Sequence, residues 1–254
     1  MDEHKIHAVE TALDDEIEEW DRRVRFRARN LVPLAVLVAG LVAFLALGFD
    51  EYVSFETLRE RRAWLMGEVD RLGFAAALIF MAIYVAAIAF SIPGALVLTL
   101  TGGFLFGTGL GVVYSVLSAT LGATIVFTIA KSALGDPLRQ RAGPWLERMA
   151  EGFQENAFCY LLVLRMIPIF PFWVVNLVPA FLGMRLGHYA AATLVGVIPA
   201  SFIITVAGAG LGGIFDSGEA FSLSSVLTPE IIFALVGLAA LVLVPLIYRK
   251  LKGR

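Results

Sequence analysis

The chain has 254 residues, 59% of them hydrophobic, and a mean hydropathy of +0.81. Soluble domains are only about 45–50% apolar, so this composition indicates an integral membrane protein. The net charge of −2 says little about partners, because the charges gather in a few short segments. A single cysteine, Cys159, excludes an intramolecular disulfide and a multi-cysteine metal site.

The N-terminal tail, residues 1–30, is polar and ends in an arginine cluster from Arg22 to Arg29. Residues 31–49 carry no charge. The run is about as long as one helical membrane crossing, which takes about 20 residues. Positive charges beside a first span predict that the tail is cytoplasmic. Contact between these arginines and anionic lipid is an alternative role.

Residues 50–71 are rich in charge. Five apolar side chains within this segment could form one face of a helix, namely Phe55, Leu58, Trp64, Leu65 and Val69. The pattern predicts an amphipathic helix that lies on the membrane surface.

Residues 72–130 contain no Asp, Glu, Lys, Arg or His and are long enough for nominally three crossings of about 20 residues each. The sequence Ser91-Ile92-Pro93-Gly94 breaks this run, because proline removes a backbone donor and ends a helix. Two interpretations fit. The segment forms three spans, or a helical hairpin over about 72–107 enters and leaves on one side and one span follows to about Ala130.

Residues 155–183 are too short for two crossings of about 20 residues each. They also contain Arg165 and three prolines, Pro168, Pro171 and Pro179. An arginine in hydrocarbon costs about 2.5–3.5 kcal/mol, and broken backbone at membrane depth is tolerated only where protein buries it or water reaches it. We therefore predict a re-entrant hairpin over 155–183.

Two local similarities indicate an internal repeat. Pro93-Gly94 followed by residues 103–107 parallels Pro171 followed by residues 180–183, and residues 119–122 parallel residues 192–196 in the same order. The repeat favours a re-entrant hairpin in the first half as well.

Charge bias orients the predicted spans. With a cytoplasmic N-terminus, the basic residues of 131–148 and of the C-terminal tail lie inside, and the loop 212–230, which has no Lys or Arg, lies outside. The arginines of 50–71 are the exception. The hairpins then enter from opposite faces, as in inverted-topology repeats.

The predicted fold is an all-α polytopic membrane protein with two re-entrant helical hairpins in an inverted repeat plus about four transmembrane helices. Its membrane domain covers residues 50–213. Residues 214–254 are expected to form an outer loop, a last span and a basic cytoplasmic tail.

Four segments together resemble the DedA/VTT-domain superfamily, also called SNARE-associated Golgi proteins. They are residues 58–65, 91–94 with 102–107, 165–172 with Asn176, and 193–196 with Pro199. The chain is most similar to the bacterial branch that resembles the yeast and animal Golgi members. The resemblance covers about 55–213 and implies two re-entrant loops, a role in lipid translocation or scrambling, and a bacterial inner membrane.

Bacterial DedA members are linked to recycling of a polyprenyl-phosphate carrier and to proton-motive force. Their pattern places an acid after the first Pro-Gly, where this chain has Ala95. A buried acid is the usual proton carrier in membrane transporters. The resemblance therefore extends to lipid binding and does not extend to proton coupling.

We expect Arg165 to bind an anionic headgroup, most simply a phosphate, because a guanidinium presents paired donors. Free backbone N–H groups at the two breaks would assist. The alternatives are that Arg165 snorkels to the surface or caps helix carbonyls. The candidate substrate-binding residues are Arg165, Asn176, Pro168, Pro171, Gly102, Gly103, Pro93 and Gly94. Ser91, Thr99 and Thr101 are further candidates for a polar path between the hairpins.

Other classes of function lack support in the sequence. Its three histidines form no catalytic triad or metal motif, the glycines at 107–111 lack the lysine of a P-loop, and the basic residues are short topology flanks. We expect no enzyme activity, cofactor, metal or nucleic-acid partner. The expected function is an anionic-lipid transporter or scramblase whose partner is membrane lipid. A small-anion transporter and a non-transporting scaffold are the alternatives, and the oligomeric state stays open.

Overall fold

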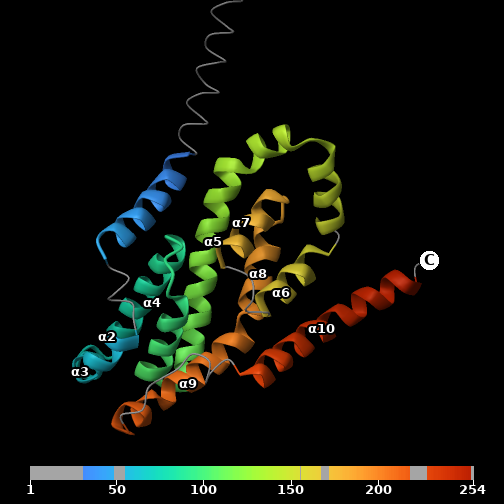
Figure 1. Cartoon of the computed structure of the whole chain (residues 1–254). Coiled ribbons are helices and arrows are strands. Elements are labelled where there is room, and N and C mark those ends of the chain that lie inside the picture. The colour runs from blue at the N-terminus through green and yellow to red at the C-terminus, as the bar shows by residue number, and fades with distance from the viewer. Residues whose placement is uncertain (1–30, 49–54, 155, 167–171, 218–227, 253–254) are drawn as a thin grey trace, which may run out of the picture.

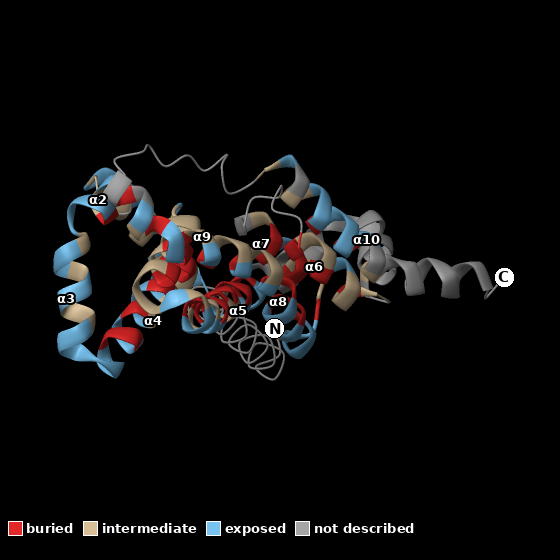
Figure 2. Cartoon of the chain, turned by 90° about the horizontal axis from the view of Figure 1, so that it is seen from below, coloured by how far each residue is buried: buried red, intermediate tan, exposed pale blue. Residues whose placement is uncertain are grey.

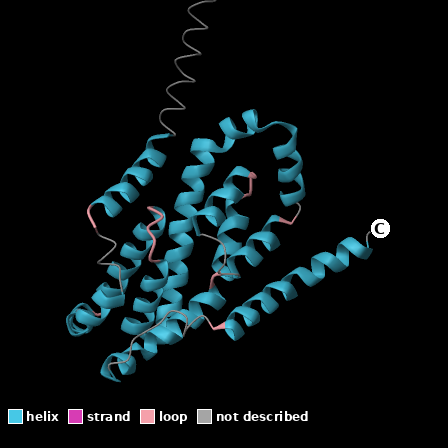
Figure 3. Ribbon diagram, viewed as in Figure 1, coloured by secondary structure: helices cyan, strands magenta, loops and turns pink. Residues whose placement is uncertain are grey.

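The computed structural model describes residues 31–48, 55–154, 156–166, 172–217 and 228–252, and the elements in these ranges are helices (Figure 3). They are a helix over Leu31–Ala46, α2 (Phe55–Glu60), α3 (Arg62–Leu72), α4 (Phe74–Ala89), α5 (Ala95–Gln154), α6 (Ala157–Met166), α7 (Phe172–Phe181), α8 (Leu186–Gly196), α9 (Ile198–Ser217) and α10 (Pro229–Lys252). Two stretches, Ala95–Ala133 and Leu186–Gly213, are long and apolar enough to cross a membrane. The expected all-α membrane protein is therefore confirmed.

The first half begins with a helical hairpin. After α4 the chain turns at Ser91, whose φ is 54°, and at Gly94, whose φ is 134°. The returning arm, residues 95–106 of α5, packs along α4. The Tyr84 hydroxyl lies 2.9 Å from Thr99 Oγ1 across the two arms. We call residues 74–106 hairpin 1.

Helix α5 reverses direction at Gly107, where φ is 73°. The rings of Phe106 and Tyr114 lie 5.3 Å apart, and a Cβ on Gly111 would lie 2.7 Å from the carbonyl oxygen of Gly102. An unbroken helix would separate positions nine apart by about 13 Å, at 1.5 Å per residue. Residues 108–133 thus form a long helix beside hairpin 1, and α5 then arches over the top of the bundle toward α6 (Figure 1).

The second half repeats this order. Helices α6 and α7 form hairpin 2, residues 157–181, and the chain turns at Gly183 with a φ of 77°. Helices α8 and α9 then form the second long helix. Gly107 and Gly183 occupy the same place in each half and share the same backbone conformation, so the internal repeat predicted from the sequence is present in the fold.

A second pair of glycines supports the repeat. A Cβ on Gly122 would lie 2.6 Å from Cβ of Ile88, and a Cβ on Gly196 would lie 2.7 Å from Cβ of Arg165. Each glycine therefore lets a long helix approach the first arm of its own hairpin closely. Arg165 in hairpin 2 occupies the place that Ile88 holds in hairpin 1.

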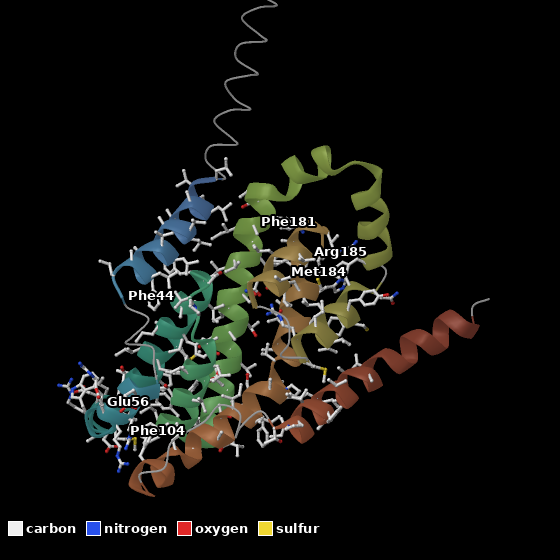
Figure 4. The ribbon with its side chains drawn as sticks, viewed as in Figure 1. Phe44, Glu56, Phe104, Phe181, Met184 and Arg185 are labelled. Atoms are coloured by element: carbon white, nitrogen blue, oxygen red, sulfur yellow. The ribbon has the colours of Figure 1, made fainter. Side chains whose placement is uncertain are left out.

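The two halves are inverted relative to each other. At one end of the bundle, Lys131 Nζ donates to the carbonyl oxygen of Met184 at 2.7 Å. At the other end, the rings of Phe104 and Phe215 lie 5.8 Å apart. The long helices therefore run antiparallel, and the hairpins enter from opposite ends, where Figure 4 labels Phe104 and Met184.

The halves are joined through the second arm of hairpin 1. A Cβ on Gly103 would lie 2.7 Å from Cα of Thr205, and one on Gly208 would lie 2.9 Å from the carbonyl carbon of Leu100. Backbones this close exclude side chains and maximise contact between helices. Buried residues concentrate along α5 and the helices packed against it (Figure 2).

One expectation needs correction. The segment predicted as one surface helix is two helices, α2 and α3, which meet at Arg61. The predicted span from His188 to Leu211 lies within Leu186–Gly213, which is long and apolar enough to cross a membrane. A break at Val197, two residues before Pro199, divides this stretch into α8 and α9.

Candidate functional site

A cavity of about 220 Å³ lies where the two hairpins meet. Its polar side chains come from both halves: Tyr84 and Thr99 from hairpin 1, Arg165 from hairpin 2, and Ser201 from α9. The rest of the lining is aliphatic: Ile88, Ala95, Leu96, Ala119, Leu164, Val175, Val197, Ala200 and Ile204. The cavity thus combines one cation with hydroxyl groups in an apolar wall.

Arg165 is held inside the protein by side chains from α7 and α8. The residue is 7% exposed. Its Nη2 donates to Asn176 Oδ1 at 2.7 Å, to the Tyr189 hydroxyl at 2.8 Å and to Thr193 Oγ1 at 3.2 Å. These three acceptors are uncharged side chains. Its burial excludes the alternative in which Arg165 snorkels to the surface.

Tyr189 fixes this network in place. The residue is fully buried and its ring stacks on Phe127 at a centroid distance of 4.1 Å. The hydroxyl of Tyr189 donates to Asn176 Oδ1 at 2.9 Å. The carbonyl oxygen of Ala123, at 3.3 Å, is a second and longer acceptor for the same hydroxyl. The partners of the guanidinium therefore lie on α7 and α8, and Tyr189 connects them to α5.

Asn176 carries a second polar atom beside the guanidinium. Its Oδ1 accepts from Arg165 and Tyr189, which orients the amide. Its buried Nδ2 has no hydrogen-bond partner among the described residues. A buried donor left unsatisfied costs about 1–3 kcal/mol, so a hydrogen-bond acceptor beside this amide would stabilise the site.

The wall from hairpin 1 carries hydroxyl groups. Thr99 Oγ1 donates to the carbonyl oxygen of Ala95 at 2.7 Å and lies 2.9 Å from the Tyr84 hydroxyl. Ala95, the position at which the DedA branch has an acid, lines the cavity. This wall therefore offers neutral groups opposite the cation of hairpin 2.

The structure brings together only part of the predicted site. Arg165 and Asn176 bond directly. Gly102 and Gly103 pack inside hairpin 1 and against α9, and Pro93 and Gly94 form the turn of hairpin 1; none of the four lines the cavity. Their role in binding stays a prediction. Pro168 and Pro171 lie outside the described residues.

Sequence reasoning gave no role to Tyr84, Tyr189 or Ser201. The available signal was the position of Tyr84 and Tyr189 in otherwise apolar helices, and the spacing of Tyr189 and Thr193 by four residues, which places both on one helical face. Among the described residues, no group of three or more His, Cys, Asp or Glu could hold a metal ion.

Fold and site together define an all-α membrane protein with a buried arginine between its helical hairpins. The VTT domain family matches residues 92–210. The chain belongs to this family, the superfamily of VTT-domain or SNARE-associated Golgi proteins. No solved structure matches the chain.

Several relatives are proteins named transmembrane protein 41. The chain is 32% identical to the Dictyostelium discoideum homolog over 177 residues, which cover 68% of this chain and 51% of that protein. It is 31% identical to transmembrane protein 41B of Mus musculus over 176 residues, which cover 67% of this chain and 58% of that protein. The Caenorhabditis elegans homolog is 30% identical over 172 residues, 66% of this chain and 67% of that protein. The chain therefore spans only about half of the first two relatives.

Proposed function

We propose that this protein moves an anionic lipid, of the phospholipid or polyprenyl-phosphate type, across the bilayer. Its headgroup would occupy the cavity between the hairpins. The observation that carries this proposal is the position of Arg165, a permanently charged group, in the wall of a cavity whose other described lining residues are uncharged. Such a site attracts an anion, and a guanidinium suits phosphate.

Hairpins that are re-entrant in the membrane would serve this function. An arm of 10 residues, as in α6 and α7, is about 15 Å long, whereas the hydrocarbon core is about 30 Å thick. Two short hairpins that enter from opposite ends would meet near the midplane. Transporters built from inverted repeats place their substrate sites there.

The aliphatic lining favours lipid over a hydrated solute. Residues such as Leu96, Leu164 and Ile204 would tolerate acyl or prenyl chains while the headgroup contacts Arg165, Thr99 and Ser201. Pockets for drug-sized ligands span about 300–1,000 Å³, so the 220 Å³ cavity also suits a small oxyanion. A small-anion transporter is therefore the second candidate.

We further propose that the protein lies in a bacterial inner membrane with both termini in the cytoplasm. It carries lipid and is not an enzyme. The location rests on the family resemblance, and the orientation rests on the positive-inside rule.

The test is translocation of a fluorescent anionic phospholipid in proteoliposomes. Ala200→Phe fills the cavity, whereas Ala209→Phe adds the same group to an exposed position of α9. We expect wild type and Ala209→Phe to translocate lipid and Ala200→Phe to be at least tenfold slower at an unchanged melting temperature. Equal rates for both variants would exclude the cavity as the path. Uptake of radiolabelled phosphate without lipid movement would favour the small-anion transporter.

A further inference from the structure

A second hollow lies outside the site described above, between the helices α2 and α3 and hairpin 1. It has a volume of about 500 Å³, within the range of about 300–1,000 Å³ that ligand pockets occupy. Figure 2 shows α2, α3 and α4 grouped at this side of the molecule. We call it the hairpin 1 groove. Its apolar lining is Leu58, Trp64, Leu65, Val69, Leu72, Ala76, Ile79, Phe80, Ile83, Val97, Leu98, Leu105 and Phe106.

The polar side chains of this groove are unevenly placed. Thr57, Arg61 and Glu68 all belong to the α2–α3 side, and the only polar residue of hairpin 1 in the described lining, Thr101, donates its hydroxyl to the carbonyl oxygen of Val97 at 2.8 Å. The groove is therefore apolar along hairpin 1 and polar along one rim. That division fits an amphiphile.

The charged side chains of the rim differ in whether they are paired. The Glu68 carboxylate accepts from Arg71 Nη2 at 2.5 Å and from Arg71 Nε at 3.0 Å. Arg61 forms no ion pair with the described residues, unlike Arg59, which pairs with Glu56 at 3.9 Å. An anionic headgroup at the rim would therefore meet an available guanidinium.

The groove opens onto an exposed apolar face of α4. Ile79 and Ile83 line it and are 48% and 56% exposed, and the neighbouring Leu78 is 53% exposed. In a membrane protein, a helix face with such large apolar side chains contacts acyl chains rather than water. A lipid can therefore enter from the bilayer without crossing water.

The groove and the central cavity lie on opposite faces of one arm. Val97, Leu98 and Thr101 face the groove, whereas Leu96 and Thr99 face the cavity. Hairpin 1 thus separates the two spaces, and a ligand in one does not occupy the other.

We infer that the hairpin 1 groove binds one anionic glycerophospholipid from the surrounding membrane. An acyl chain lies along α4 and the returning arm, and the phosphate contacts Arg61. This binding is independent of the proposed transport, because it uses neither Arg165 nor the central cavity.

Trp64 lines the groove and can report on its occupant. The experiment uses the full chain with the other three tryptophans replaced, Trp20→Phe, Trp145→Phe and Trp173→Phe, in phosphatidylcholine vesicles. Phosphatidylglycerol with brominated acyl chains is added stepwise, and quenching of Trp64 fluorescence gives its binding relative to phosphatidylcholine. Arg61→Gln removes the rim charge, and Arg59→Gln is the matched control. Val97→Phe narrows the groove, and Val113→Phe adds the same ring to an exposed position of the long helix.

We expect phosphatidylglycerol to bind at least threefold more tightly than phosphatidylcholine. Arg61→Gln should bring this ratio to about one, and Arg59→Gln should leave it unchanged. Val97→Phe should lower the maximal quenching, and Val113→Phe should not. A wild-type ratio of one, or equal ratios for the two arginine variants, would overturn the inference. Native mass spectrometry of otherwise wild-type chains provides a second measurement, in which Arg61→Gln should lose retained phosphatidylglycerol and Arg59→Gln should keep it.

Discussion

Arg165 Nη2 donates to Asn176 Oδ1 at 2.7 Å and so joins the two arms of hairpin 2. The Tyr189 hydroxyl donates to the same oxygen at 2.9 Å and ties both arms to the long helix α8. The bonds hold a cation in place with uncharged partners. This arrangement fixes the guanidinium of Arg165 in the wall of the neighbouring cavity.

A carboxylate at position 176 should neutralise the positive charge of Arg165 permanently. Asn176→Asp would pair with Arg165 at hydrogen-bond distance, so the protein should stay folded while anionic-lipid translocation falls at least tenfold. Asn176→Ala would instead remove an acceptor from a buried donor and should destabilise the fold by about 1–3 kcal/mol. Thermal unfolding in detergent, measured beside translocation in proteoliposomes, separates the two effects. Wild-type translocation by Asn176→Asp would show that the charge of Arg165 is not used.

The hydroxyl wall of hairpin 1 can be tested with Tyr84→Phe. This change removes the hydroxyl that lies 2.9 Å from Thr99 Oγ1 and should cost about 0.5–1.5 kcal/mol of stability. We expect translocation to slow several-fold, because the cavity loses a polar contact. Tyr114→Phe is the matched control, since Tyr114 packs its ring on Phe106 and does not line the cavity. Equal rates for the two variants would limit Tyr84 to a structural role.

Ala95 lets us test what an acid would do at this place in the cavity. Ala95→Asp puts a carboxylate into a wall that Arg165 also lines. The carboxylate should compete with an anionic headgroup and lower translocation more than the neutral Ala95→Asn does. Translocation assays with and without a pH gradient would compare both variants. If Ala95→Asp translocates as fast as Ala95→Asn, electrostatic competition at this site is excluded.

The two turns that follow the hairpins should respond alike to the same substitution. Gly107 and Gly183 have φ angles of 73° and 77°. An alanine pays about 1–2 kcal/mol in this left-handed conformation, so Gly107→Ala and Gly183→Ala should each lower stability by that amount. Gly109→Ala should not, because Gly109 lacks a positive φ and a Cβ there meets nothing within 4 Å. Chemical denaturation in detergent provides the comparison.

The close crossing of hairpin 1 and α9 should be intolerant of a methyl group. Gly103→Ala would place Cβ 2.7 Å from Cα of Thr205, and overpacking of this kind costs about 1–3 kcal/mol. Gly210→Ala on α9 meets nothing within 4 Å and should be neutral or slightly stabilising. Melting temperatures that do not differ between the two variants would mean that the helices separate readily at this crossing.

The sequence by itself determined the class of protein, an all-α membrane protein, and its family. These properties depend on local signals: long uncharged runs, the breakers at Pro93-Gly94, and an arginine between prolines. Gly107 and Gly183 end the two similar segments of the sequence. Both have a positive φ, and glycine is favoured wherever the chain reverses in this left-handed conformation.

Only the tertiary structure decided which side chains meet at Arg165. Tyr189 and Thr193 lie more than 20 positions from Arg165 along the chain, yet both bond to its guanidinium. Tyr84 and Thr99 reach the same cavity from the other half. Uncharged hydrophobic helices carry no charge pattern that specifies their neighbours, and close packing at residues such as Gly103 and Gly196 sets those contacts instead. The partners of the buried cation therefore follow from how the two halves pack.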